Sequence, residues 1–355
     1  MRKTVEYKKS EINEAGQKIA LNTLSNEEKT QYLKIIDNWR VAHAFPMNTF
    51  AINLKNQVAD IPGAIVVQRL KRLDTIIGKI KRYPKMELYR MQDLGGCRVI
   101  VPTVEDVYLV KKRLRESRIR HILHNEKDYI ATPKSNTGYR GIHLVYRYKS
   151  EKNKNYNGLQ TEIQIRTQLQ HLWATAVETV GLFTQNDLKF NQGSESWLDF
   201  FKWVSALFSV EERSAIVEGV PTDPKVIAYT VLEKLGELEV IDRLMTIGIA
   251  TKHVPKLKRK KKKRPGYYYL LILDFNSLKL YIEEYDGIDE ANERYNEIET
   301  QNSFKDEKKV NVVLVSAQSF DALLNAYPNY FVDIRNFNNT LLDLIGKFGE
   351  LPKPD

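Results

Sequence analysis

The sequence predicts an α/β (α+β) fold in which helices flank a mixed β-sheet, followed by a small ββαβα domain. Two observations predict this. Helical and strand periodicities alternate along the first two thirds of the chain, and a basic run separates them from a second set of elements. The length of 355 residues suits two domains. We therefore expect a body at 1–255, a basic linker at 256–266 and a C-terminal domain at 267–355.

The body is expected to begin with helices. Apolar residues among polar neighbours predict helical structure over 10–45, ending near Pro46. The segment 66–80 has an apolar stripe at helical spacing and predicts a second helix, which Pro84 closes. Four basic residues would lie along this helix, an arrangement that is usually a solvated face: Arg69, Lys71, Arg72 and Lys79.

Strands and helices alternate in the rest of the body. Short apolar runs and alternation with period two predict strands at 97–102, 141–149 and 159–167, the first after a turn at Gly95-Gly96. The predicted helices are 104–117, 169–183 and most of 185–250. In the last of these, four aromatic residues are expected in the core: Trp197, Phe200, Trp203 and Phe208.

The C-terminal domain shows a similar succession. A hairpin is predicted at 267–275 and 278–285, a helix at 289–299, a strand at 309–316, and short helices at 319–327 and 338–348. No internal repeat is evident.

The composition indicates the cellular compartment and the kind of partner to expect. The chain has one cysteine, Cys97, and neither a signal peptide nor an apolar run long enough to span a membrane, which is typical of a cytoplasmic protein. The formal charge is +10 over 1–255, +8 over 256–264 and −8 over 267–355. A basic body favours a polyanionic partner such as a nucleotide or RNA, for which an acidic domain could compete.

The segment TEIQIRT is the most informative part of the sequence. In a strand, Glu162, Gln164 and Arg166 project to one face, about 6.5–7 Å apart, while isoleucines project to the other. Taken alone, such a strand is more often half exposed, with solvated polar residues. Two other polar segments carry suitable chemistry. The glycine-containing loop 128–143 offers Tyr139 for base stacking, and Asp93 precedes a Gly-Gly pair and Arg98, although loops and turns of this kind are common.

Together these segments resemble the synthetase domain of the RelA/SpoT family over about residues 40–185. The family's R-x-K-x-x-x-S-I-x-x-K stretch corresponds to Arg69 to Lys79, and D-x-x-G-x-R to Asp93 to Arg98. The D-Y-I loop corresponds to 128–143, and E-x-Q-I-R-T to Glu162 to Thr167. The departures are Thr75 and Gly141 in place of serines, and an extra Thr137.

The resemblance implies a mixed-sheet, nucleotidyltransferase-like core that transfers diphosphate from ATP to a hydroxyl, with Mg²⁺ as cofactor. Asp93 and Glu162 would bind the metal, and Glu162 would also orient or deprotonate the attacking hydroxyl. The catalytic set would be Asp93, Arg98, Tyr139 and Glu162. The ATP-binding residues would be Arg69, Lys71, Arg72, Thr75, Lys79 and Arg98. The acceptor-binding residues would be Lys134, Asn136, Tyr139, His143, Gln164 and Arg166.

The identity of the acceptor and the role of the C-terminal domain are linked. Most family members pyrophosphorylate GDP or GTP to give (p)ppGpp, whereas a toxic branch modifies the 3′ CCA end of tRNA. The outline of the C-terminal domain is similar to the pseudo-zinc-finger antitoxin of CapRel fused toxin–antitoxins, which a phage protein such as a major capsid protein releases. Their Y-x-x-Y motif, which plugs the nucleotide site, corresponds to Tyr327 and Tyr330. The plainer interpretation is that both tyrosines pack in their own domain's core.

We therefore expect a self-inhibited pyrophosphokinase that acts on tRNA in anti-phage defence. The alternatives are a (p)ppGpp synthetase with a regulatory C-terminal domain, and a non-catalytic binding module. Two basic groups are candidate tRNA contacts, unless they are merely solvated: the run 256–264, and a helix cluster of Lys111, Lys112, Arg113, Arg115, Arg118 and Arg120. The oligomeric state stays open, and a monomer is compatible with the sequence.

Overall fold

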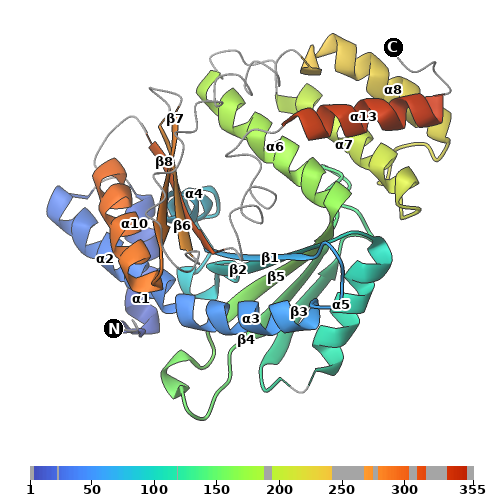
Figure 1. Cartoon of the computed structure of the whole chain (residues 1–355). Coiled ribbons are helices and arrows are strands. Elements are labelled where there is room, and N and C mark those ends of the chain that lie inside the picture. The colour runs from blue at the N-terminus through green and yellow to red at the C-terminus, as the bar shows by residue number, and fades with distance from the viewer. Residues whose placement is uncertain are drawn as a thin grey trace.

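The computed structural model describes residues 4–21, 24–117, 119–187, 194–241, 268–274, 279–303, 310–316 and 334–349. Within these ranges one eight-stranded mixed sheet has the order β3-β4-β5-β2-β1-β8-β6-β7 (Figure 1). All paired strands are antiparallel except β2 and β5, which are parallel. The α/β class that the sequence predicts is confirmed.

The body contributes five strands to this sheet. They are β1 (Ile65–Leu70), β2 (Gly95–Val101), β3 (Ile122–Asp128), β4 (Ile142–Arg147) and β5 (Gln160–Thr167). Paired residues lie in rows across the strands: Arg69 is opposite Gly96, and Gly96 is opposite Glu162. Because neighbours in a row point to the same face of a sheet, this register brings polar residues of three strands together.

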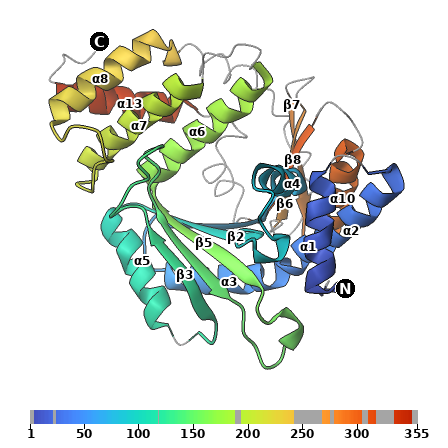
Figure 2. The same cartoon turned by 180° about the vertical axis from the view of Figure 1, so that it is seen from behind.

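Helices cover both faces of the sheet. The body contains α1 (Lys9–Ala20), α2 (Asn26–Ala42), α3 (Ala44–Gln57), α4 (Leu73–Arg82), α5 (Val104–Glu116) and α6 (Gln168–Asp187), with 3₁₀ turns at Leu88–Arg90 and Lys154–Tyr156. Helices α3 and α5 lie on one side, and α6 crosses the other (Figures 1 and 2). Capping boxes begin α2 at Ser25 and α5 at Thr103, which satisfies backbone N–H groups at each start.

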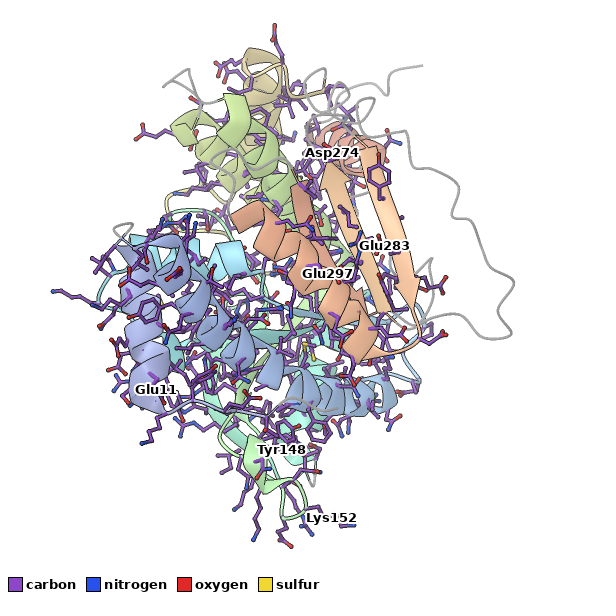
Figure 3. The ribbon with its side chains drawn as sticks, turned by 90° about the vertical axis from the view of Figure 1, so that its left-hand side faces the viewer. Glu11, Tyr148, Lys152, Asp274, Glu283 and Glu297 are labelled. Carbon is purple, nitrogen blue, oxygen red and sulfur yellow. The ribbon has the colours of Figure 1, made fainter. Side chains whose placement is uncertain are left out.

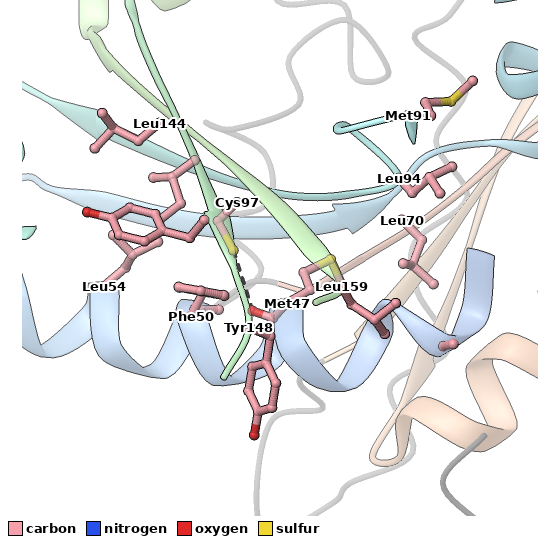
Figure 4. Close-up of a cluster of buried hydrophobic side chains, with 14 of the residues drawn as sticks. Met47, Phe50, Leu54, Leu70, Met91, Leu94, Cys97, Leu144, Tyr148 and Leu159 are labelled. Carbon is pink, nitrogen blue, oxygen red and sulfur yellow. Dashed lines mark hydrogen bonds between the residues drawn. The ribbon is translucent and has the colours of Figure 1, made fainter. Parts of the chain in front are cut away.

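The main hydrophobic core lies between α3 and the sheet. Met47, Phe50 and Leu54 of α3 are almost fully buried against strand residues that include Cys97 and Leu144 (Figure 4). The Cys97 thiol is a donor at 3.5 Å from the Met47 carbonyl oxygen, and burial raises the pKa of this thiol. Cys97 is therefore an inert core residue.

A second core lies in a layer of helices beyond α6. It contains α7 (Ser194–Glu211), α8 (Pro224–Glu237) and α13 (Ile334–Gly349), packed through aromatic rings. Phe337 of α13 lies 6.3 Å, between ring centroids, from both Phe201 and Phe208 of α7. The predicted burial of Trp197, Phe200 and Phe208 is confirmed, while Trp203 is half buried.

The C-terminal strands extend the sheet of the body. The elements are β6 (Tyr268–Asp274), β7 (Lys279–Tyr285), α10 (Ile288–Ser303) and β8 (Val310–Ser316). The order β6, β7, α10, β8 confirms the predicted hairpin, helix and strand. Strand β8 also pairs with β1 of the body, with Gln68 opposite Ser316 and Arg69 opposite Val315. The division at 256–266 stays a prediction, because the linker lies outside the described residues.

Helix α10 is fastened to α2 by a hydrogen-bond network (Figure 3 shows α10 from its exposed side, with Glu297 labelled). The amide of Asn296 donates to Asp37 at 2.9 Å and accepts from Arg40 at 2.9 Å. Arg40 is fully buried, bonds Asp37 through two nitrogens, and lies 4.4 Å from the ring centroid of Tyr295. Residues of α2 and α10, far apart in the sequence, thus hydrogen-bond to one another.

The helix predicted over 66–80 is wrong. Residues Ile65–Leu70 form β1, and α4 begins only at Leu73. Leu70 is buried in the strand and Leu73 is buried in the helix. Because they are three residues apart, they have the spacing of one apolar helical face. The β-branched run that pairs with β2 and β8 decides the outcome. Arg69 therefore projects from a strand.

Other expectations need smaller corrections. The helical segment at 10–45 is two helices, and Pro46 lies in the first turn of α3, where its missing N–H costs nothing. Gly95 and Gly96 begin β2 instead of forming a turn. Strand β3 was not predicted, because its polar sequence lies half exposed at the sheet edge. The helix predicted at 319–327 lies outside the described residues. No helix in the described part of the chain is both long and apolar enough to cross a bilayer.

We predict that Asn296→Ala loosens the C-terminal strands. The substitution leaves Asp37 and buried Arg40 each short of a hydrogen bond, which should cost about 1–3 kcal/mol of unfolding free energy. Urea unfolding measures the cost, and faster amide hydrogen exchange in Tyr268–Asp274 locates it. Glu293→Ala, at an exposed position of the same helix, is the control. Equal exchange in the two variants would contradict the anchoring role.

Candidate active site

A polar cavity of about 90 Å³ opens on the face of the sheet that α6 crosses. It is lined by Arg69, Lys71, Asp93, Gly96, Cys97, Arg98, Glu162 and Gln164. The row Arg69–Gly96–Glu162 forms its floor. A side chain at position 96 would project into the same face between the arginine and the carboxylate, so the glycine keeps this space open.

Asp93 is held at the cavity by two lysines. Its carboxylate lies 2.8 Å from Lys71 Nζ and 3.1 Å from Lys79 Nζ. Burial raises the pKa of Asp93, but the charges and hydrogen bonds of the two lysines outweigh burial and lower it below its ordinary value. Asp93 is therefore ionised at neutral pH.

Five side chains form a closed ring of hydrogen bonds beside the cavity, here called the side-chain ring. Its members are Glu162, Gln164, Arg166, Tyr139 and His143. Gln164 joins its strand neighbours: its amide nitrogen donates to Glu162 at 2.8 Å, and its oxygen accepts from Arg166 at 2.9 Å. Arg166 also donates to the Tyr139 hydroxyl at 2.7 Å. The predicted common face of these three strand residues is confirmed.

The hydrogen bonds of the side-chain ring constrain the protonation of Glu162 and Tyr139. Burial raises the pKa of Glu162, but its bond and charge interaction with His143, together with its Gln164 bond, lower it, so this carboxylate is ionised and only accepts. His143 Nδ1, 2.9 Å away, therefore carries a hydrogen, and its Nε2 lies within hydrogen-bond distance of the Tyr139 hydroxyl. Burial raises the pKa of Tyr139 against the opposing effect of Arg166, which keeps this hydroxyl protonated.

The ring face of Tyr139 is partly covered. Lys134 Nζ lies 5.3 Å and Arg166 Cζ 5.0 Å from its centroid, and Lys134 also lies 4.8 Å from the centroid of Tyr129. A base that stacks on Tyr139 would take over these cation–π positions. Because Lys134 is exposed at a loop, it is the group that can move away.

The loop that carries Tyr139 is pinned to α7. Gly138 has φ +75°, and a Cβ there would lie 2.8 Å from Ser205 Cβ, so only glycine allows this approach. Arg140 is 2% exposed and bonds Glu212 at 2.5 Å, Ser214 at 3.0 Å and Ser205 at 3.2 Å. Glu212 also accepts from Thr167 at the end of β5 and from Gln170 in α6. One buried carboxylate thus joins the loop, the strand and two helices.

Glu178 of α6 lies within reach of the cavity's arginines. Its side chain is exposed to solvent, yet surrounding protein still raises its pKa by desolvation. The fields of four arginines outweigh this and lower the pKa below its ordinary value: Arg98, Arg69, Arg166 and Arg72. This arginine group therefore already has an internal counter-charge.

The structure brings most of the predicted site residues together. Arg69, Lys71, Lys79, Asp93, Arg98 and Glu162 meet at the cavity, and Tyr139, His143, Gln164 and Arg166 form the side-chain ring. Arg72, the N-cap residue of α4, and Thr75 do not line the cavity, and Asn136 is exposed in its loop. Tyr327, Tyr330, Arg118 and the run 256–264 lie outside the described residues.

The basic cluster of α5 is largely engaged within the chain. Lys111 pairs with Glu126 and Asp128, Arg113 with Asp60, and Arg115 with Glu126. Arg120 pairs with Glu151. These pairs leave less unbalanced positive charge on this helix than the sequence suggested, so the predicted tRNA contact there loses support.

Three residues of the site were not predicted: Ser205, Glu212 and Glu178. They lie on α6, α7 or just beyond α7, in segments that show no local motif. Only the three-dimensional packing of α7 against the loop gives Ser205 and Glu212 their role. Glu178 lies 16 residues after Glu162, and nothing in its neighbours marks it.

The cavity suits a magnesium ion. Asp93 and Glu162 both line it, both are ionised, and carboxylate oxygens are the ligands that Mg²⁺ prefers, completed by water and substrate phosphate. Within the described residues, no group of three or more His, Cys, Asp or Glu could hold a metal by itself. Two carboxylates plus substrate are the donor set that this site offers.

Part of the chain matches a known protein family. Residues 68–183 match the family model described as a region found in RelA / SpoT proteins. The chain is 35% identical over 116 residues to GTP pyrophosphokinase YjbM of Bacillus subtilis, covering 32% of this chain and 54% of that protein. It is 30% identical over 125 residues to GTP pyrophosphokinase YwaC of the same organism, covering 34% and 59%.

The chain thus spans little more than half the length of the curated relatives it matches. Among solved structures, the small alarmone synthetase 1 from Bacillus subtilis is 25% identical, with a TM-score of 0.42, and the match covers 50% of this chain and 92% of that one. The small alarmone synthetase 2 from this organism is 23% identical, with a TM-score of 0.41, over 49% of this chain and 93% of that one.

We predict that Tyr139→Phe destabilises the protein. The change removes the hydroxyl between Arg166 and His143 and leaves their polar atoms unpaired, which should cost about 1–3 kcal/mol. Urea unfolding measures the loss. Tyr129→Phe is the matched control, since its hydroxyl takes part in none of the described hydrogen bonds, and it should stay within about 0.5 kcal/mol of the parent. If Tyr139→Phe and Tyr129→Phe lowered the free energy of unfolding equally, the hydrogen bonds of the side-chain ring would add no stability.

We predict that Glu212→Gln is far more damaging than Glu211→Gln. Arg140 and Glu212 have side chains 2% and 8% exposed, so removing one charge leaves the other buried and uncompensated, at about 3–5 kcal/mol. Glu211 pairs with Lys347 at the surface, where a salt bridge contributes about 0–1 kcal/mol. Thermal and urea unfolding of both variants provide the comparison. Similar stabilities would refute the role of Glu212 as a buried anchor.

Proposed function

We propose that the chain is an ATP-dependent pyrophosphokinase. The observation that carries the proposal is the cavity in which two ionised carboxylates, Asp93 and Glu162, lie beside Arg69, Lys71 and Arg98. Phosphoryl and diphosphoryl transfer require positioning and charge neutralisation more than covalent chemistry by the protein. The family match over 68–183 and the names of the two relatives support the same reaction class.

In this reaction the acceptor oxygen attacks the β-phosphorus of ATP, the bond from that phosphorus to the α,β-bridging oxygen breaks, and AMP leaves. Magnesium held by Asp93 and Glu162 would neutralise phosphate charge. Arg69 and Arg98 would bind phosphate oxygens in pairs through their planar guanidinium groups. Glu162 would orient the acceptor hydroxyl. Its lowered pKa makes it a weak base, so it would take the proton only as the new bond forms.

The side-chain ring supports the acceptor. Tyr139 is locked by His143 and Arg166, so its orientation is set before the acceptor binds. We propose the 3′ CCA end of tRNA as the acceptor, which the basic charge of the body favours. The rival acceptor is GDP or GTP, which the names of the relatives favour. On this view the protein acts in the cytoplasm.

We predict that ATP labelled at the γ-phosphate transfers label to the 3′ end of tRNA. Label in GDP or GTP instead would select the rival acceptor, and label in none of them, also with the Tyr327→Ala/Tyr330→Ala chain in which self-inhibition should be relieved, would refute a pyrophosphokinase. Asp93→Asn and Glu162→Gln should lower the rate at least about 100-fold. Glu126→Gln, whose carboxylate pairs with α5 away from the cavity, is the control and should leave the rate unchanged.

We also propose that the C-terminal region inhibits this activity until a phage protein, such as a major capsid protein, engages it. Two described anchors support this: β8 ends at Ser316 beside Gln68 and Arg69 on β1, and α13 begins at Ile334 in the layer of α7 and α8. Tyr327 and Tyr330 belong to the segment that joins these anchors. The opposite charges of the body and the C-terminal region favour the same docking.

We predict that the double substitution Tyr327→Ala/Tyr330→Ala in the full chain raises the rate of diphosphate transfer. A gain of roughly 5–150-fold matches the usual coupling between two sites. The full chain is the appropriate sample, because Phe337 and Leu341 of α13 form part of the second core and truncation would expose that core. Tyr281→Ala, an exposed tyrosine on β7, is the control. An unchanged rate in the double variant would contradict the proposal that these tyrosines inhibit the transfer.

A further inference from the structure

The connection between β1 and α4 is in contact with the C-terminal region. Strand β1 ends at Leu70 and helix α4 begins at Leu73, so a short connection joins them. The backbone N–H of Leu73 donates to the hydroxyl of Tyr295, in α10, at 3.4 Å. Both residues are almost fully buried, Leu73 at 5% and Tyr295 at 1% exposed. A residue 222 positions further along the chain thus contacts the start of α4.

This hydrogen bond takes the place of a local helix cap. The first N–H groups of a helix have no acceptor within the helix, and the side chain of the N-cap residue often provides one. The N-cap residue of α4 is Arg72. A guanidinium group carries donors and no acceptor, so it cannot accept from an N–H group. Tyr295 therefore supplies an acceptor that the sequence around the start of α4 does not.

The hydroxyl that caps α4 is held by contacts with α2. The ring centroid of Tyr295 lies 4.4 Å from Cζ of Arg40, which is fully buried. Arg40 also bonds Asp37 and Asn296, the residue that follows Tyr295. Burial raises the pKa of Tyr295 well above its ordinary value, so the hydroxyl stays protonated at neutral pH and its oxygen accepts as a neutral group. The acceptor therefore has a fixed position relative to the body.

The start of α4 lies between the two lysines that hold Asp93. Lys71 precedes Leu73 in the sequence and Lys79 follows it, and their Nζ atoms lie 2.8 Å and 3.1 Å from the Asp93 carboxylate. A change in the direction of α4 at its start would move Lys79 relative to Lys71, so both could no longer hold one carboxylate. Strand β8 supports the same part of the site, since it pairs with β1 at Arg69.

We propose that Tyr295 is a positioning residue for the donor side of the candidate active site, the part that would bind ATP and Mg²⁺. By holding the start of α4, it sets where Lys79 meets Asp93. This inference rests on the proposed function and gives the C-terminal region two opposite effects on it. Helix α10 supports ATP binding, whereas the segment that contains Tyr327 and Tyr330 is the proposed inhibitor. Release from inhibition is therefore local, with α10 still docked on the body.

Tyr295→Phe tests the contact, because it removes the hydroxyl and keeps the ring. The variants are made in the full-length Tyr327→Ala/Tyr330→Ala chain, the parent here, whose nucleotide site should be open. Hydrogen exchange should become faster in the first turn of α4. Binding of α,β-methylene ATP with Mg²⁺ should weaken about 2–10-fold, the factor for one hydrogen bond, while binding of the acceptor, tRNA or GTP, should stay unchanged.

Tyr285→Phe is the matched control. It removes a hydroxyl that donates to Glu283 within β7, so the C-terminal region also loses one hydrogen bond, but one that does not reach α4. Exchange in α4 and binding of the ATP analogue should both equal those of the parent.

Three results with Tyr295→Phe would overturn this role. Unchanged exchange in α4 would show that the hydroxyl does not hold that helix in solution. Faster exchange with unchanged affinity for the ATP analogue would show that the donor side does not depend on the start of α4. Equal weakening of analogue and acceptor binding would indicate a general loss of structure. If the parent itself binds no analogue, the proposed reaction fails together with this role, which distinguishes that outcome from the other three.

Discussion

The arrangement of the candidate active site depends on the side-chain ring, a closed circuit of hydrogen bonds in which Glu162 is linked to Tyr139 by two routes. One route passes through His143, and the other through Gln164 and Arg166. Because the circuit closes, no member can rotate without breaking two bonds. The carboxylate and the tyrosine to which the proposed reaction assigns the acceptor hydroxyl and the acceptor base are thereby held in one fixed relation.

That circuit is itself supported from outside the sheet. The loop of Tyr139 is gripped by α7 through Gly138 and Arg140, and Glu212 joins the same helix end to β5 and α6. Helix α13 packs on α7, and its Lys347 pairs with Glu211, the neighbour of Glu212. The C-terminal region therefore contacts the element that positions Tyr139, as well as the edge of β1 beside Arg69.

The pattern of residues along the sequence predicted much of the fold and of the candidate site. It failed where contacts between distant segments determine the structure. The period of two in β5 gave the shared face of Glu162, Gln164 and Arg166, because a strand's alternation is fixed by its own backbone. The same kind of reasoning wrongly predicted a single helix where β1 and α4 lie. Leu70 is buried on the strand and Leu73 on the helix, and their spacing in the sequence is that of one helical face. Glu212 and Ser205 gave no signal, because their role exists only once α7 meets a loop some 65–72 residues earlier. The continuation of the sheet through β8 was likewise invisible, as strand partners are not encoded in a strand's own periodicity.

The pairing of β8 with β1 has a consequence for how this chain is made and handled. In the complete sheet β1 has a neighbour on both sides, β2 and β8. Before β8 is synthesised, or after it is removed by proteolysis, this side of β1 is an unpaired sheet edge whose N–H and C=O groups can recruit a strand from another molecule. Self-association of nascent or truncated chains is the hazard that follows, and β8, which pairs with Gln68 and Arg69, covers that part of the edge within the chain.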